Sequence, residues 1–86
     1  MKQLTISQIR SRIKKAGIDM GAIHYLKRTW VDVGFEPDNL SNSDANKVLA
    51  VRVAKALGWD AVVGHVMGTS LYRVLGPTRP TLAYID

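Results

Sequence analysis

The first stretch with a clear hydrophobic period covers residues 5–16, where apolar side chains recur at helical spacing. Thr5 and Gln8 fit a capping box at its start, and Gly17 follows as a C-terminal stop. These features predict a helix over residues 5–16. Its expected apolar stripe consists of Ile6, Ile9, Ile13 and Ala16.

A second helical period follows Ser41 and Ser43, either of which can cap a helix. Gly58 marks its end. The pattern predicts a helix over residues 43–57. The stripe expected to be buried consists of Ala45, Leu49, Val53 and Ala56, widened by Leu57.

The segment between these helices is ambiguous. Residues 23–35 are rich in β-branched and aromatic side chains, which favours a strand, but the run is long for one strand. Lys27-Arg28 would make a poor hairpin turn. A period of 3.6 also fits, and we therefore predict a helix over about 20–32, with a strand as the open alternative.

After residue 61 the pattern changes to AVVGHVM, GT and SLYRVL, which predicts a β-hairpin. Gly68-Thr69 is a Gly-X pair typical of type II′ turns. The pairs expected across this turn are Val66 with Leu71, His65 with Tyr72 and Val62 with Leu75.

Together these elements predict a mainly α fold, with three helices and a C-terminal β-hairpin in one domain over residues 1–76. Residues 77–86 are expected to form an extended tail or an edge strand. If 23–35 is a strand instead, the fold is α+β, with the order α-β-α-β-β and the helices on one face of a small sheet.

The net charge of +5 is unevenly distributed. Residues 1–30 are strongly basic, whereas residues 31–46 hold four acidic side chains and no basic one. Such a chain suits a polyanion on some of its faces. The expected phosphate contacts in the basic region are Lys14, Lys15, Lys27 and Arg28.

Several classes of function lack support in the sequence. There are no cysteines, and His24 and His65 stand apart, so no metal site is expected. Phosphate-binding, dinucleotide-binding and nucleophile-elbow motifs are missing as well, and we expect neither an enzyme nor a cofactor. No apolar run is long enough to cross a membrane, and the start has no apolar core like that of a secretory signal. A cytoplasmic protein without a membrane partner is expected.

The outward face of the helix predicted over 43–57 combines long cations with small apolar side chains. Lysines can reach phosphates, while Val51 and Ala54 can touch thymine methyl groups. This face therefore predicts contact with double-stranded DNA. Its members are Ser43, Lys47, Val51, Arg52, Ala54 and Lys55.

The run from Ser43 onward resembles the winged helix-turn-helix modules at the C-terminal end of phage and plasmid replication primase–helicases. The resemblance rests on Leu57-Gly58-Trp59, Gly68, Tyr72-Arg73 and Pro77. It implies a DNA-binding function in replication or in transcription regulation of a mobile element. The residues it implies are Lys47, Val51, Arg52 and Lys55 for the groove and Arg73 for a wing contact.

Two alternatives stay open. Ala16-Gly17-Ile18, with Ile23 and Leu26, also resembles a simple helix-turn-helix, in which His24, Lys27 and Arg28 would form the reading face. The α+β reading instead predicts a small phage-type interaction module or inhibitor. It would contact a protein partner through Trp30 or Trp59 and a Val51–Ala54 patch.

Overall fold

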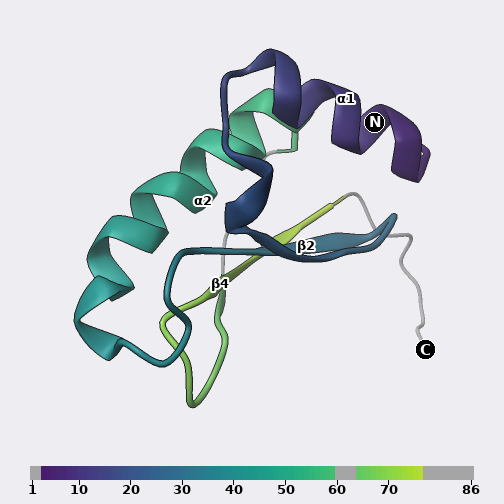
Figure 1. Cartoon of the computed structure of the whole chain (residues 1–86). Coiled ribbons are helices and arrows are strands. Elements are labelled where there is room, and N and C mark those ends of the chain that lie inside the picture. The colour runs from purple at the N-terminus through teal and green to yellow at the C-terminus, as the bar shows by residue number, and fades with distance from the viewer. Residues whose placement is uncertain (1–2, 60–63, 77–86) are drawn as a thin grey trace, which may run out of the picture.

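In the part of the chain that the structure describes, two helices pack on one face of a four-stranded antiparallel sheet (Figure 1). The computed structural model describes residues 3–59 and 64–76. The strand order in the sheet is β1-β2-β4-β3. The elements are α1 (Ile6–Lys15), the 3₁₀ turn η1 (Met20–Ala22), β1 (Ile23–Leu26), β2 (Trp30–Val33), the 3₁₀ turn η2 (Leu40–Asn42), α2 (Ser43–Leu57), β3 (Gly64–His65) and β4 (Tyr72–Leu75).

The prediction of a mainly α fold with a C-terminal hairpin is therefore wrong. Two strands precede the long helix, and they join the later hairpin in one sheet. The α+β alternative had the right class, but its single strand over 23–35 is in fact a hairpin. The order is α-β-β-α-β-β. The edge strand or tail expected over residues 77–86 lies outside the described residues.

The prediction of α1 is confirmed to within one residue at each end. The Gln8 N–H donates to the Thr5 hydroxyl, and the Gln8 side chain accepts from the Thr5 N–H, which completes the capping box. Ile9 and Ile13 are buried, and Gly17 has a positive φ of 76°. Local sequence signals fix this helix.

The helix predicted over 20–32 is wrong, because β1 and β2 form a hairpin there. The Lys27 N–H donates to the Trp30 carbonyl (N–O 2.8 Å), which closes the turn that the sequence disfavoured. The Thr29 carbonyl accepts from the Gly76 N–H (2.8 Å), so the turn is also tied to the end of β4. Burial of Val31 and Val33 under the helices, together with pairing on both sides of β2, outweighs the poor local turn preference.

The bounds predicted for α2 are confirmed, but its buried face is rotated from the expected one. Ala45 is exposed and Leu49 only half-buried, while Ala54, expected to point outward, is buried. Neither serine caps the helix with its side chain, because the N-cap is Asn42, at the end of η2. The buried residues of α2 are Asn46, Ala50, Val53, Ala54 and Leu57.

A buried amide explains the rotation of α2. The Asn46 side chain accepts from the Phe35 N–H (2.9 Å) and donates to the carbonyls of Phe35 (3.1 Å) and Ser70 (3.0 Å). Gly34 comes so close that a Cβ there would lie 2.7 Å from the Asn46 amide nitrogen. Asn46 thus ties α2 to both hairpins, and its polar contacts turn the helix toward it.

The hairpin of β3 and β4 forms with the expected pairing. His65 faces Tyr72, and the Val66 N–H donates to the Leu71 carbonyl (2.9 Å). Its turn differs from the predicted one: the Thr69 N–H donates to the Val66 carbonyl (3.1 Å), which places Gly68, with φ 81°, third in the turn. The expected pair of Val62 with Leu75 lies outside the described residues.

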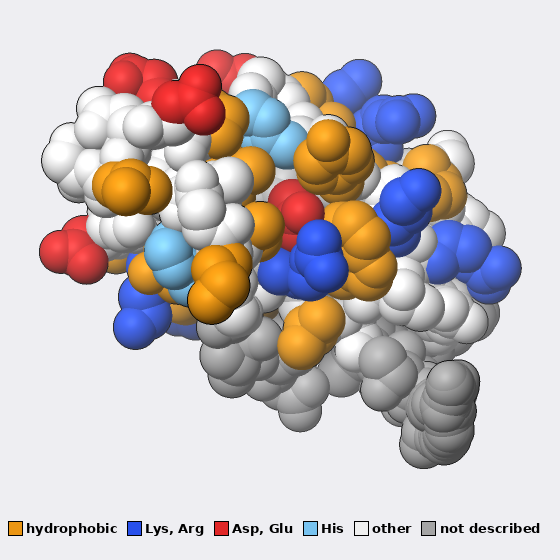
Figure 2. All heavy atoms as spheres, turned by 90° about the horizontal axis from the view of Figure 1, so that it is seen from below, with side chains coloured by type: hydrophobic (Ala, Val, Ile, Leu, Met, Phe, Trp, Pro, Cys, Tyr) orange, Lys and Arg blue, Asp and Glu red, His pale blue; other side chains and the backbone are white. Residues whose placement is uncertain are grey.

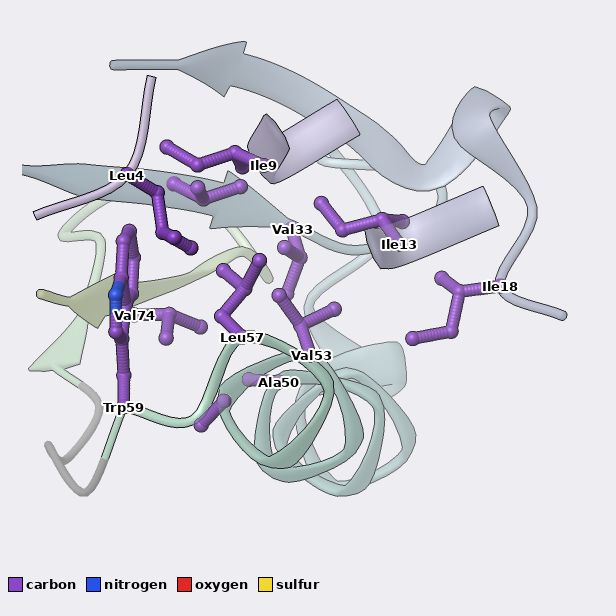
Figure 3. Packing of buried hydrophobic residues seen from close by; sticks show 12 residues of the cluster. Leu4, Ile9, Ile13, Ile18, Val33, Ala50, Val53, Leu57, Trp59 and Val74 are labelled. Carbon is purple, nitrogen blue, oxygen red and sulfur yellow. The ribbon is translucent and has the colours of Figure 1, made fainter. Parts of the chain in front are cut away.

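The core fills the space between the sheet and the helices (Figure 3). Leu57, Val53 and Ile13 point from the helices toward Val33 and Val74 of the sheet. Trp59 closes one end and is only 4% exposed. None of the helices in the described part of the chain has the length and apolar character to span a membrane.

Candidate nucleic-acid interface

The sheet has a second face, which no helix of the described part covers (Figures 1 and 2). Side chains alternate along a strand, so the neighbours of the buried valines in β2 and β4 point away from the helices. Cross-strand pairing brings these side chains into one group: Asp32 lies opposite both Tyr25 and Arg73, and Trp30 lies opposite Leu75. We call this group the open face, and its members are Tyr25, Trp30, Asp32, Arg73 and Leu75.

An ion pair stacked on an aromatic ring occupies the centre of the open face. The Arg73 guanidinium donates from Nε to Asp32 Oδ1 (2.7 Å) and from Nη2 to Asp32 Oδ2 (3.0 Å). Its Cζ lies 3.8 Å from the centroid of the Trp30 ring. Asp32 is only 2% exposed, whereas 40% of the Arg73 side chain remains exposed. The carboxylate is therefore covered by the arginine that neutralises it.

The charge on Arg73 is strongly favoured in this setting. The hydrogen bonds that Arg73 donates to the Asp32 carboxylate are the main reason why the pKa of Arg73 is raised above its ordinary value. Burial opposes this rise, and the negative charge of Asp32 adds a smaller contribution in the upward direction. The guanidinium is thus held as a planar cation in one orientation. Two of its three nitrogens already have acceptors.

Tyr25 stands beside this stack with its ring largely free. It is 59% exposed, and its centroid lies 6.5 Å from that of Trp30 with the planes inclined at 57°. The two rings contact without stacking, so the faces of the tyrosine ring stay open.

Two cations flank the open face at the turn between β1 and β2. Lys27 and Arg28 are exposed and lie within three residues of Tyr25 and Trp30 along the chain. Figure 2 shows Lys and Arg side chains along the right edge of this side, and acidic side chains toward the left edge. Glu36 and Asp38 lie in the connection to α2, and Asp44 lies in the first turn of that helix.

The helical layer carries a separate group of cations. The outer side of α1 holds four basic side chains and no acidic one, and all four are exposed. A shallow hollow along this side is lined by Arg10, Lys14 and Lys15 together with two serines. We call this group the α1 basic face, and its members are Arg10, Arg12, Lys14 and Lys15.

The α1 basic face continues to the end of α2. Arg12 donates from Nη1 to the Leu57 carbonyl (3.4 Å), and a second hollow between the helices is lined by Arg12, Lys15, Ala16 and Ala56. Lys55 lies in the last turn of α2. The C-terminal ends of both helices attract cations, which accounts for part of this cluster. Arg10 lies too far from the end of α1 to share that role.

The residues predicted on the outward face of α2 lie there in part. Lys47, Arg52 and Lys55 are exposed, and so is Val51. Ser43 is half-buried, and Ala54, expected to touch a base, is buried in the core. The exposed apolar neighbour of Val51 is instead Val48.

Arg73 does not sit with these residues. It was expected on a wing beside the α2 face, yet it lies on the open face, across the sheet from both helices. The predicted contacts therefore divide between two sides of the molecule. Lys14, Lys15, Lys47, Val51, Arg52 and Lys55 belong to the helical layer, and Lys27, Arg28 and Arg73 belong to the sheet.

The histidines take part in local contacts. His24 Nε2 lies 2.8 Å from the Gly34 carbonyl, and the His65 ring contacts that of Tyr72 with centroids 5.1 Å apart. The alternative in which His24, Lys27 and Arg28 read DNA from a helix is wrong, because His24 lies in strand β1. Residues 3–59 and 64–76 contain no acid, histidine or cysteine group able to hold a metal ion.

Sequence reasoning missed Tyr25 and Asp32 as functional candidates. In a regular strand Ile23 and Tyr25 would point to the same face, but a register shift between them turns the tyrosine outward. Asp32 would have stood out only if residues 30–33 had been recognised as a strand. A charged residue between two buried valines then requires a partner on the next strand.

No protein-family model, curated protein or solved structure matches this chain. Its function therefore has to be argued from its own residues.

Proposed function

We propose that this chain is a small nucleic-acid-binding module whose helical layer contacts the phosphates of double-stranded DNA. The observation that carries the proposal is the α1 basic face, with four exposed cations and no acidic side chain. Within the described part of the chain, the single ion pair joins Arg73 to Asp32, so these four cations have no carboxylate partner there.

Phosphate binding fits this arrangement better than an ordinary solvated helix. Surface helices usually mix charges of both signs, which stabilises them through pairs three or four residues apart. The α1 basic face lacks such pairs, and its two hollows are lined by Arg10, Lys14, Lys15 and Arg12. A duplex presents closely spaced phosphates to such a row of cations, and the release of counterions drives binding.

The proposal is tested by fluorescence anisotropy of a labelled duplex titrated with the protein at several salt concentrations. Lys14→Ala removes one cation, and it should weaken binding to all duplexes alike and lower the salt slope by about one. Lys47→Ala makes the same change in charge near the start of α2, away from α1. An unchanged slope in Lys14→Ala would contradict the proposal, and a slope lowered only in Lys47→Ala would move the contact to the outward face of α2.

A second candidate function, protein binding, is favoured by an apolar patch at the other end of α2. Val48 is 64% exposed, and Phe35, Leu40 and Val51 are exposed as well. A groove lined mainly by Phe35, Ala45, Val48 and Leu49 runs between the loop and the helix. Trp59 and Ala54, expected in such an interface, are buried and take no part.

The patch suits an apolar partner surface, and charges of both signs border it, with Asp44 in the first turn of α2 and Arg52 in the lining of the groove. The simplest form of such protein binding is self-association of two copies of this chain. Sedimentation velocity over a range of concentrations should show a dimer that Val48→Lys abolishes. A wild-type chain that stays monomeric throughout would exclude pairing of two copies through this patch.

A further inference from the structure

We propose that the open face is a second, separate nucleic-acid site, which stacks the unpaired bases of a single strand. This goes beyond phosphate binding by the helical layer, because it uses the other side of the sheet and a different chemistry. The site consists of Tyr25, Trp30 and Arg73, flanked by Lys27 and Arg28.

Arg73 is held in one orientation by its contacts. The Trp30 ring supports one side of the guanidinium at 3.8 Å, and the two bonds to Asp32 fix its edge. Since Asp32 already neutralises it, this arginine is poorly suited to bind a phosphate. Its exposed planar side still offers a surface on which a flat ring can stack, and unpaired bases stack on guanidinium planes as they do on aromatic rings.

Tyr25 is exposed on the same face. Large aromatic rings are costly to leave in water, and this one stands clear of the core on a strand. It is inclined to Trp30 instead of stacked on it, so a base can lie against its face. Tyr25 and Arg73 lie on the strands either side of β2, opposite the same residue, Asp32. Two stacking surfaces therefore lie on the same face of the sheet, with β2 between them.

The charges around the open face favour a nucleic acid over a protein as its occupant. Lys27 and Arg28 extend the site with two exposed cations, suited to the phosphates that link successive bases. The one carboxylate of the open face is neutralised by Arg73. Aromatic side chains with cations along one edge match a single strand, whose bases and phosphates alternate along one path.

A duplex does not fit this site. Its bases are stacked on each other and hidden from a flat protein surface, and only its phosphates can reach Lys27 and Arg28. Preference for unpaired over paired strands is therefore the signature of the open face, and it separates this site from the α1 basic face.

The test compares a labelled single-stranded oligonucleotide with the matching duplex by fluorescence anisotropy at one salt concentration. Tyr25→Ala should weaken binding of the single strand about 5- to 150-fold, the range expected for loss of one stacked base. It should leave duplex binding unchanged within about twofold, since Tyr25 lies on the open face, on the other side of the sheet from the helical layer. Tyr25→Phe, which keeps the ring, should bind like the wild type.

Arg73→Lys gives an independent check, because it keeps the charge and removes the planar surface. It should also weaken binding of the single strand and spare the duplex. Ser41→Ala serves as the control, since this exposed side chain lies in η2, outside both proposed nucleic-acid sites. Trp30 fluorescence gives a second readout: bases should quench it, whereas the buried Trp59 should be unaffected.

The results separate this proposal from the proposed function. Equal affinity for both oligonucleotides, or full binding of the single strand by Tyr25→Ala, would overturn the stacking site even if Lys14→Ala weakens the duplex. Tyr25-dependent binding of the single strand would support the stacking site even if the duplex does not bind at all. A protein that binds neither oligonucleotide would contradict both.

Discussion

The two faces of this small sheet are stabilised by different kinds of contact. On the covered face, Val31, Val33 and Val74 pack against aliphatic side chains of the helices, and none of them is exposed. On the open face there is no helix within the described residues, and Asp32 is buried only because Arg73 and its neighbours lie over it. One face is stabilised by burial of apolar surface, the other by a charged pair lying on a ring.

This difference separates stability from function. Side chains that hold the covered face together are out of reach of any partner. Those of the open face contribute less to folding and stay accessible, so they can be changed without loss of the fold. Substitutions on the two faces should therefore differ strongly in their effect on the free energy of unfolding.

The largest difference is expected between two leucines. Leu57→Ala leaves a cavity in the core and should lower the free energy of unfolding by about 2–5 kcal/mol. Leu75→Ala removes the same atoms from an exposed position of β4 and should cost about 0.5 kcal/mol or less. Urea denaturation of both variants measures this directly. Similar losses would mean that the open face is covered after all.

Asn46→Ala should have the next largest effect. It leaves the Phe35 N–H and the Ser70 carbonyl without their partner at the end of the covered face, which should cost about 1–3 kcal/mol. The control is Asn42→Ala, whose side chain donates to the same Phe35 carbonyl from an exposed position. Thermal unfolding should show a clearly lower melting temperature for Asn46→Ala and little change for Asn42→Ala. Equal drops in melting temperature would show that the buried amide of Asn46 contributes no more to stability than the side chain of Asn42.

The helices were predictable from the sequence because their signals are local. Thr5 with Gln8, and Gly58 after a long helical period, act within one turn of the chain. The first hairpin was not predictable in this way. Its turn residues, Lys27 to Thr29, are poor local choices, and the hairpin forms because β2 pairs with β4, about forty residues further along the chain.

The candidate site was predictable only where local sequence patterns determine the position of a residue. Exposed cations such as Lys14 and Lys47 could be located from helical period alone. Arg73 could not, because its position depends on Asp32 in another hairpin. Asn46 reversed a further expectation, since a single buried amide turned α2 enough to bury Ala54 and expose Ala45.

Asp32→Asn tests the charged pair of the open face and should lower the free energy of unfolding by about 1.5 kcal/mol, because it weakens the bonds to a charged group. The raised pKa of Arg73 keeps the arginine charged, so its share of the pair is fully present below its ordinary pKa and is lost only as the pH rises through the raised value. The loss in free energy of unfolding caused by Asp32→Asn should therefore be the same at neutral and at mildly alkaline pH. Trp30 fluorescence should shift as the guanidinium leaves the ring. A variant with wild-type stability and an unshifted spectrum would show that the pair is not what holds Arg73 in place.

Tyr25→Ala should have the smallest effect on stability. The ring is 59% exposed, and its tilted contact with Trp30 is its one aromatic contact among the described residues, so the loss should stay near 0.5 kcal/mol. Tyr25→Phe should be indistinguishable from the wild type in the same thermal unfolding experiment. A loss above about 1 kcal/mol would assign the ring a structural role in the sheet. A small change in the free energy of unfolding together with a large loss of single-strand binding would show that Tyr25 serves binding and not folding.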